Sequence, residues 1–254
     1  MKNLKIALFQ LPYYGKLELQ KLNIEDKIKQ LSKDIVLVVL PEMTLYEAEG
    51  EDVIEQNQET LHFLKTLSRK YRKVIIGNAI VATSIGAKNR AYVVYPNGLH
   101  TFYDKHQLFG KEQEKVVSGE KHLVIQLNGW KILIQICYDL RFPEWNRMNE
   151  QDYDAILFLA AWPKKRIHAW NILLQARAIE NVSYVIGVNR TGGSYSGHSQ
   201  VINPVGDIMV GSMEEDAVIE YELQYDALKK IRISHPYLAT RERFLLLPSE
   251  DVFK

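Results

Sequence analysis

The sequence predicts a layered α/β domain, and three observations support this fold class. Short runs rich in Val, Ile, Leu and Tyr recur along the chain, as expected for strands. Between some of these runs, apolar residues return every three or four positions, as on one face of a helix. The 254 residues, 46% of them hydrophobic, suffice for one sizeable core, so we interpret residues 1–254 as a single domain.

Many of the predicted strands are apolar at both odd and even positions, which is typical of strands covered on both faces. We predict strands over residues 5–10, 35–40, 74–79, 91–95, 124–127, 131–136, 155–160, 184–189 and 199–202. Amphipathic helices are predicted over residues 17–31, 52–71 and 168–181.

Turn signals at residues 96–98 and 203–206 predict hairpins, so the sheet cannot be wholly parallel. The glycine-containing stretch of residues 191–197 is predicted to be a loop over a site rather than a boundary between domains.

Composition argues against several classes of partner. Lys and Arg number 32 against 31 Asp and Glu, and a net charge of +1 provides no field to hold a nucleic acid. No apolar run approaches the roughly 20 residues that span a bilayer, and the first residues do not form a secretion signal, so we expect no membrane partner. One cysteine cannot form an internal disulfide, and no CxxC or HExxH pattern provides a metal site, so we expect a cytoplasmic protein.

Cys137 directly follows the apolar run of residues 131–136. A thiol at the carboxyl end of a buried strand lies where α/β folds often place their sites, and it can serve as a nucleophile. The alternative is a small buried side chain with no chemical role.

Glu42 comes after a second apolar run, residues 34–40. Buried carboxylates are rare without a partner or a task. We expect burial to raise the pKa of Glu42, which suits a general base near neutral pH. The alternative is a surface glutamate at the end of a strand.

Lys105 follows a third segment rich in β-forming residues, and a solvated lysine is the ordinary expectation there. Beside a thiol, its ammonium group would favour the thiolate and could hold the oxyanion formed when a carbonyl is attacked. The neighbouring His106 invites a cysteine–histidine pair, although its spacing alone proves nothing.

Together these segments resemble the glutamate, lysine and cysteine signature of the nitrilase superfamily of carbon–nitrogen hydrolases. The resemblance rests on residues 40–42, 103–106 and 137–144, is supported by residues 176–181 and 188–190, and extends in order to residues 202–206. It implies a four-layer αββα sandwich, with two mixed sheets between helical layers, and a homodimer in which two sandwiches stack.

Within the superfamily, residues 137–143, residues 160–163 and the short length most resemble the omega-amidase branch. Its members hydrolyse the terminal amide of 2-oxoglutaramate or 2-oxosuccinamate to the 2-oxo dicarboxylate and ammonia. The resemblance also implies a second glutamate between the lysine and the cysteine. Glu112 and Glu114 are both candidates, and the spacing to Ser118 favours Glu112.

The resemblance further implies a mechanism without a metal or an organic cofactor. Glu42 would take the thiol proton while Cys137 attacks the amide carbonyl. Lys105 and the backbone N–H of Tyr138 would hold the oxyanion, and Glu112 would position substrate or water.

The implied substrates carry a carboxylate, which requires a cation in the site. Arg141, Arg190 and the basic cluster of residues 164–166 are candidates, and the sequence does not choose between them. Trp162 and His168 are further candidates for the wall of the substrate pocket, although a histidine at the start of a helix is often packed or solvated.

Two alternative functions remain open. One is a related enzyme that acts on an N-carbamoyl group or another small amide, since the catalytic residues fix the reaction type more firmly than the substrate. The other is a metabolite-binding protein that keeps the fold without turnover, against which the presence of all three catalytic residue types argues.

Overall fold

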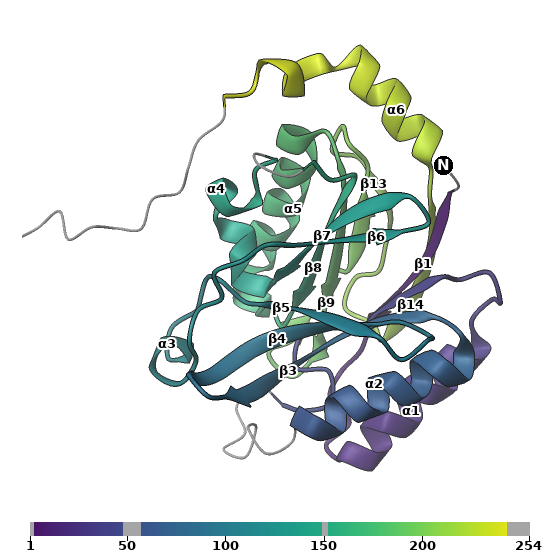
Figure 1. Cartoon of the computed structure of the whole chain (residues 1–254), viewed down its shortest axis with the longest axis vertical. Helices are drawn as coiled ribbons and strands as arrows, with labels where there is room; N and C mark the ends of the chain where they lie inside the picture. Colours follow the sequence, from purple (N-terminus) through teal and green to yellow (C-terminus); the bar gives the residue numbers. More distant parts are fainter. Residues whose placement is uncertain (1–2, 48–56, 149–151, 243–254) are drawn as a thin grey trace, which may run out of the picture.

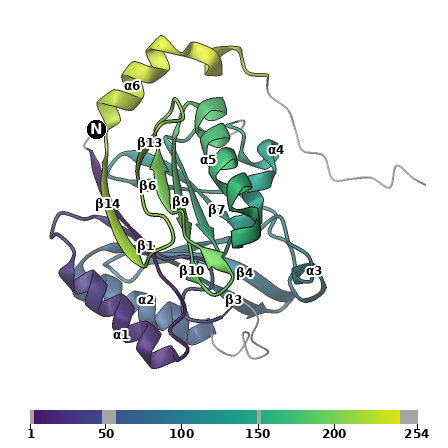
Figure 2. The same cartoon turned by 180° about the vertical axis from the view of Figure 1, so that it is seen from behind.

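The computed structural model describes residues 3–47, 57–148 and 152–242, which form two six-stranded sheets packed face to face (Figure 1). Helices cover the outer side of each sheet, so the layers follow the order helix, sheet, sheet, helix (Figures 1 and 2). The four-layer αββα sandwich implied by the resemblance is confirmed.

Both sheets are mixed, as the turn signals predicted. In the first sheet, of order β14-β1-β2-β3-β4-β5, the neighbouring pairs β1–β2 and β2–β3 are parallel and the other pairs are antiparallel. In the second, of order β13-β12-β9-β8-β7-β6, the pairs β7–β8 and β8–β9 are parallel and the other pairs are antiparallel. The strands of the first sheet are β1 (Leu4–Gln10), β2 (Leu37–Val39), β3 (Val74–Thr83), β4 (Gly86–Val94), β5 (His100–Asp104) and β14 (Ala217–Leu223). Those of the second are β6 (Leu123–Leu127), β7 (Trp130–Ile136), β8 (Ala155–Ala160), β9 (Tyr184–Asn189), β12 (Gln200–Ile202) and β13 (Ile208–Gly211).

The long helices α1 and α2 lie together outside the first sheet, and α5 lies outside the second (Figures 1 and 2). The α-helices are α1 (Leu17–Gln30), α2 (Asn57–Tyr71), α3 (Glu112–Lys115), α4 (Pro143–Asn146), α5 (Ile167–Asn181) and α6 (Tyr225–Ser234). Short 3-10 turns are η1 (Cys137–Arg141), η2 (Lys164–Arg166) and η3 (Pro236–Thr240).

Strand β1 illustrates why the strands are apolar at both parities. Leu4, Ile6 and Leu8 are buried in the core between the two sheets. Ala7 and Phe9 point the other way, into the core beneath α1 and α2. Burying one such large side chain stabilises the fold by about 1.5–3 kcal/mol, so a strand that is apolar on both faces is held between two layers.

Several elements are not predicted by the sequence patterns. Strands β5, β13 and β14 and helix α6 belong to this group. In β14, Glu220 is exposed between the buried Ile219 and Leu223, because this strand lies at the edge of the first sheet and has one covered face.

Several predicted elements differ in extent or in content from the structure. Helix α2 begins at Asn57, and residues 52–56 of the predicted helix lie outside the described residues. The predicted loop at residues 191–197 contains a short pairing of β10 (Thr191–Gly192) with β11 (Tyr195–Ser196). Its role over a site is supported, since Ser194 and Tyr195 line the cavity described below.

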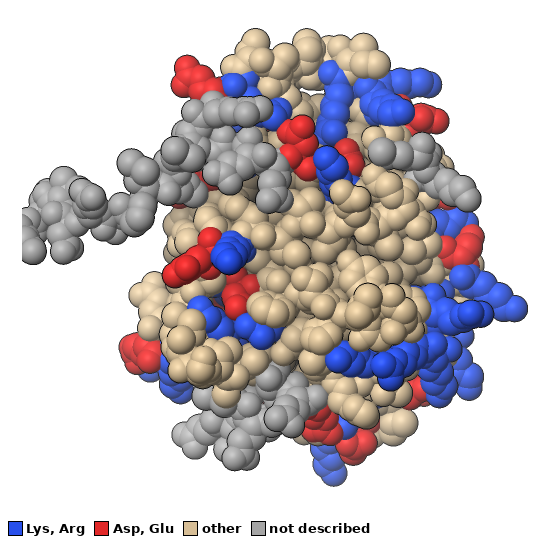
Figure 3. All heavy atoms as spheres, in the orientation of Figure 1, with Lys and Arg blue, Asp and Glu red and all other residues tan. Residues whose placement is uncertain are grey.

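Charged side chains of both signs are spread over the face drawn in Figure 3, in keeping with the near-zero net charge. Lysine and arginine gather at the lower right of this view, near the last turn of α2, which carries Arg69 and Lys70. Within the described ranges, no helix has both the length and the apolar character needed to cross a membrane.

Candidate active site

The ends of three strands bring the predicted reactive side chains into one cavity of about 650 Å³. Lys105 directly follows β5 and Cys137 directly follows β7, while Glu42 lies three residues beyond the end of β2. Strands β2 and β7 belong to different sheets, so the cavity lies where the two sheets open at their strand ends.

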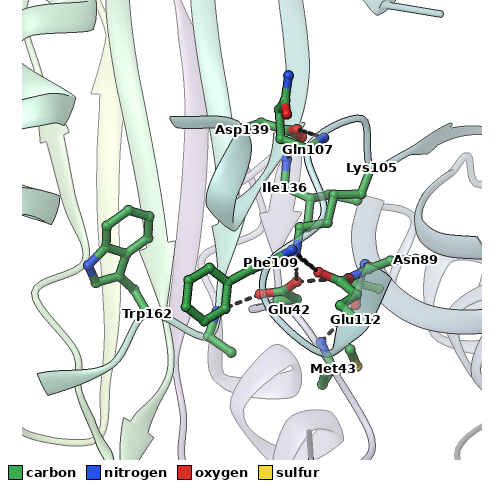
Figure 4. A network of polar contacts seen from close by, with 12 residues as sticks. Glu42, Met43, Asn89, Lys105, Gln107, Phe109, Glu112, Ile136, Asp139 and Trp162 are labelled. Carbon is green, nitrogen blue, oxygen red and sulfur yellow. Dashed lines mark hydrogen bonds and ion pairs between the residues drawn. The ribbon is translucent and has the colours of Figure 1, made fainter. Parts of the chain in front are cut away.

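Glu42 is buried and accepts hydrogen bonds at both carboxylate oxygens (Figure 4). Its Oε1 accepts from Lys105 Nζ at 3.0 Å and from Asn89 Nδ2 at 2.9 Å. Its Oε2 accepts from the backbone N–H of Ala161 at 2.9 Å. The thiol of Cys137 is a further hydrogen-bond partner of this carboxylate. Glu42 is therefore held firmly, with one contact directed at the thiol.

Lys105 lies between two carboxylates, with its Nζ 3.0 Å from Glu42 Oε1 and 2.9 Å from Glu112 Oε2. Burial lowers the pKa of Lys105, but the negative charges around the ammonium raise it by more than burial lowers it. The net shift of the pKa is therefore upward. Lys105 is therefore a permanent cation in this site.

Glu112 joins the cluster, whereas the exposed Glu114 does not. Besides its ion pair with Lys105, Glu112 accepts from Asn89 Nδ2 at 2.7 Å and from the backbone N–H of Phe109 at 3.0 Å. The short helix α3 directs these two glutamates differently, and that direction is not readable from the sequence.

Cys137 has a backbone φ of 43°, an unusual left-handed conformation that turns the chain sharply out of β7. Burial and the charge of Glu42 raise the pKa of the thiol well above its usual value, against the opposing effect of Lys105. Lys105 favours the thiolate, as expected, but desolvation and the nearby carboxylate outweigh this effect, so the net shift of the thiol pKa is upward.

The expectation for Glu42 needs a similar correction. Burial raises the pKa of Glu42, but Lys105 and the hydrogen bond from Asn89 lower it more, so the net shift is downward. At rest the site therefore pairs an ionised carboxylate with a neutral thiol. Such a pair is ready for proton transfer from sulfur to oxygen at the moment of attack.

Asp139 supports this arrangement and was not identified from the sequence. Its carboxylate accepts from Tyr103 Oη at 2.8 Å, from the backbone N–H of Gln107 at 2.7 Å and from that of Ile136 at 3.0 Å. It thus fastens the segment after the lysine to the turn that holds the cysteine (Figure 4). Burial raises the pKa of Asp139 to about 6.

Asn78 and Asn89 are also functional candidates that sequence reasoning missed. Both are buried, Asn78 in β3 and Asn89 in β4. Buried amides need partners, so polar residues inside such strands were the available signal. The predicted strand over residues 91–95 began too late to include Asn89.

Three of the predicted substrate-binding residues line the cavity: Tyr138, Arg141 and Trp162. The guanidinium carbon of Arg141 lies 5.0 Å from the ring centroid of Trp162. Arg166, from the basic cluster at residues 164–166, also lines the cavity and lies 4.5 Å from the ring centroid of Phe109. The aromatic rings give both cations a defined position.

The structure places three other candidates away from this wall. His168 is exposed in the first turn of α5 and is outside the cavity lining. Arg190 is buried, and its Nη1 donates to the carbonyl oxygens of Met43 at 3.2 Å and Tyr46 at 2.7 Å. His106 makes a 2.6 Å hydrogen bond through Nδ1 to the carbonyl of Gly119, so it does not pair with the cysteine.

The described residues contain no group of three or more His, Cys, Asp or Glu side chains placed to hold a metal ion. In the charged cluster, the two carboxylates of Glu42 and Glu112 instead share the single ammonium of Lys105. A reaction without a metal remains a prediction, tested below.

Comparison with known proteins agrees with this geometry. The model of the family described as carbon-nitrogen hydrolase matches residues 5–233. Omega-amidase YafV of Yersinia enterocolitica is 35% identical, with 97% of this chain and 100% of that protein covered. The 2-oxoglutaramate amidase of Bacillus subtilis is 30% identical, with 88% and 91% covered.

Solved structures show the same fold. XC1258 of Xanthomonas campestris, a CN-hydrolase superfamily protein with an arsenic adduct in its active site, has a TM-score of 0.92 at 31% identity, covering 97% of this chain and 100% of that one. Nit3 of Saccharomyces cerevisiae, a member of branch 10 of the nitrilase superfamily, has a TM-score of 0.85 at 25% identity, covering 96% and 97%. Because the family model and these relatives span nearly the whole chain, the protein belongs to the carbon-nitrogen hydrolase family of the nitrilase superfamily.

Proposed function

We propose that this protein is an omega-amidase that hydrolyses the terminal amide of 2-oxoglutaramate or 2-oxosuccinamate. Its similarity to proteins named omega-amidase and 2-oxoglutaramate amidase supports this assignment to the omega-amidase branch. The observation that carries the proposal is the charge of the cavity wall. Apart from Glu42 and Glu112, the charged side chains in the described lining are all cationic: Lys105, Lys111, Lys115, Arg141 and Arg166. An amide that also bears a carboxylate complements such a wall.

The first half of the reaction forms a thioester. Glu42 takes the Sγ proton as Cys137 attacks the amide carbon, and the carbonyl oxygen becomes an oxyanion. Lys105 and the backbone N–H of Tyr138 stabilise that charge. Glu42 then returns the proton to the amide nitrogen, the carbon–nitrogen bond breaks, and ammonia leaves.

The second half hydrolyses the thioester. Glu42 removes a proton from water as the water oxygen attacks the thioester carbonyl, and the tetrahedral intermediate expels the Cys137 thiolate. The thiolate recovers its proton from Glu42, which restores the resting state. Glu112 holds Lys105 and orients substrate or water beside it.

The expected test result is ammonia release from 2-oxoglutaramate or 2-oxosuccinamate at a higher kcat/KM than from neutral amides of similar size. Arg141→Met or Arg166→Met should raise KM for these substrates about tenfold or more, since a hydrogen bond to a charged group contributes about 1.5–3 kcal/mol. The KM for a neutral amide should stay within about twofold. Exhaustive chelation should leave the rates unchanged, because the proposed electrophile is Lys105.

Lys164→Met is a matched control, because Lys164 is exposed beside Arg166 and pairs with Glu214 at 3.0 Å instead of lining the cavity. Preference for a neutral amide would overturn the proposed substrate, and faster release from an N-carbamoyl compound would favour the alternative enzyme. Loss of activity on chelation that zinc restores would overturn the metal-free mechanism.

We also propose that the protein is a homodimer in the cytoplasm, where its single thiol stays reduced. Ile172 and Ile179 on α5 are 50% and 51% exposed, and Ile179 lies against the turn at Gly206 beside the exposed Val205. An apolar surface of this kind on one face of α5 is suited to a symmetric contact between two copies.

Light scattering at micromolar concentration should give twice the chain mass of 29.4 kDa. Ile179→Glu should shift the protein towards the monomer, because it places a charge in the proposed apolar contact. Leu99→Glu, at a 68% exposed position in the turn between β4 and β5, is the control and should leave the mass unchanged. A monomeric wild-type protein would contradict the dimer without affecting the proposed chemistry.

A further inference from the structure

Asn89 contacts both glutamates of the site with the same nitrogen atom. Its Nδ2 donates to Glu42 Oε1 at 2.9 Å and to Glu112 Oε1 at 2.7 Å (Figure 4). The side chain is buried in β4, with a relative exposure of 1%. Glu42 and Glu112 approach the cavity from separate segments of the chain, and Asn89 links them.

The orientation of this amide follows from a chain of hydrogen bonds that begins at a backbone donor. The N–H of Met43 can only donate, and it bonds to Asn78 Oδ1 at 2.8 Å. Asn78 Nδ2 must then face Asn89, and it donates to Asn89 Oδ1 at 2.7 Å. That leaves Asn89 Nδ2 directed at the carboxylates. The direction of this series of hydrogen bonds is thus fixed by the backbone N–H of Met43, the residue that follows Glu42.

Sheet register explains how the two asparagines meet. Asn78 in β3 pairs with Ala91 of β4, and Asn89 pairs with Ile80 of β3, so the asparagines are diagonal neighbours on one face. The same face carries Ile76 and Ala91 into the core between the sheets. At the cavity end of that core, the amides replace apolar side chains.

The site needs such a donor because it places two carboxylates around a single ammonium. Two nearby carboxylates ordinarily drive one of them to bind a proton, and a protonated Glu42 could not act as the base. Each hydrogen bond to an ionised carboxylate favours the ionised form. The ammonium of Lys105 supplies one such contact to each glutamate, and Asn89 supplies another.

We propose that Asn89 is a positioning residue that holds Glu42 and Glu112 on either side of Lys105, in an orientation set by Asn78. The inference rests on the roles proposed above for the two glutamates. Cys137 and Arg190 also interact with Glu42, the cations Lys111, Lys115, Arg141 and Arg166 line the same cavity, and Asp139 interacts with Lys105 from beyond the pair. None of these groups is altered by a substitution at Asn89 or Asn78.

The test is a pH titration of protein labelled with ¹³C at the glutamate carboxyl groups, which leaves Asp139 silent. The resonances are assigned by their loss in Glu42→Gln and Glu112→Gln. In Asn89→Ala, Glu42 should titrate about one pH unit or more above its wild-type midpoint. Asn78→Ala should shift this midpoint in the same direction but by less, since Asn89 remains and loses only its fixed orientation. Turnover by Asn89→Ala should show a kcat at least about tenfold lower, with KM within about threefold.

Asn97→Ala is the matched control, because Asn97 lies in the turn at the other end of β4, where its Oδ1 accepts from the N–H of Leu99 at 3.0 Å. Its titration and kcat should equal those of the wild type. Where Asn89→Ala does not fold, Asn89→Ser carries the same titration, since its shorter hydroxyl cannot reach both carboxylates. An unchanged midpoint for Glu42 in the folded variant would overturn the proposal. The titration needs no substrate, so a wild-type enzyme inactive on amides would overturn the proposed function and leave this test standing.

Discussion

Cys137→Ala is expected to lower kcat by at least about a thousandfold, because the chain has no other thiol that could form the thioester. The fold should persist. The change removes one sulfur atom from a buried position, and a void of about that size costs about 1 kcal/mol. Ammonia release measures the loss of turnover, and thermal unfolding measures the stability.

The same pair of proteins, wild type and Cys137→Ala, can reveal the thioester intermediate. In rapidly quenched mixtures of the wild-type enzyme and substrate, mass spectrometry should show the chain heavier by the acyl group, because ammonia has already left. The alanine variant should show no such species, and a single cysteine makes the assignment to Cys137 unambiguous. Residual activity above about a tenth of the wild-type rate would mean that another group attacks the amide.

The positions of Glu42 and Cys137 could be predicted from the sequence because each follows an apolar run that forms a buried strand. Lys105 follows β5, in which only Tyr103 is buried, and it was recognised through the resemblance, together with the other two residues. The core strands were recognisable for the same reason, since burial on both faces makes both parities apolar. Edge strands such as β14 lack that signal, and the pairing of β14 with β1 joins opposite ends of the chain.

The hydrogen-bond partners could not be predicted, because they depend on register and direction. Asn89 reaches the glutamates only through the pairing of β3 with β4, and Glu112 differs from Glu114 only in where a short helix points it. The resting charges also depend on opposing effects. Burial and Lys105 shift the pKa of Glu42 in opposite directions, and only the contacts decide which effect prevails.

Glu42→Gln is expected to lower kcat by about 10²–10⁴-fold at neutral pH, because it removes the base and keeps the shape of the side chain. The variant should also be less stable. Three donors point at the carboxylate, from Lys105, Asn89 and Ala161, and the amide nitrogen of glutamine cannot accept from any of them. An unsatisfied buried donor costs about 1–3 kcal/mol, which thermal unfolding would detect.

The pH dependence separates the loss of a base from damage to the fold. In the wild type, the pKa of Glu42 lies below its usual value, so the base stays ionised throughout the neutral range and its titration adds no slope there. In Glu42→Gln, attack requires the free thiolate of Cys137, whose fraction rises with pH, so the residual rate should rise as well. Glu114→Gln makes the same change of charge at an exposed position, two residues after Glu112. This variant should keep the wild-type rate and pH profile. A Glu42→Gln enzyme that retained more than about a tenth of the activity, with a wild-type profile, would assign the base to another residue.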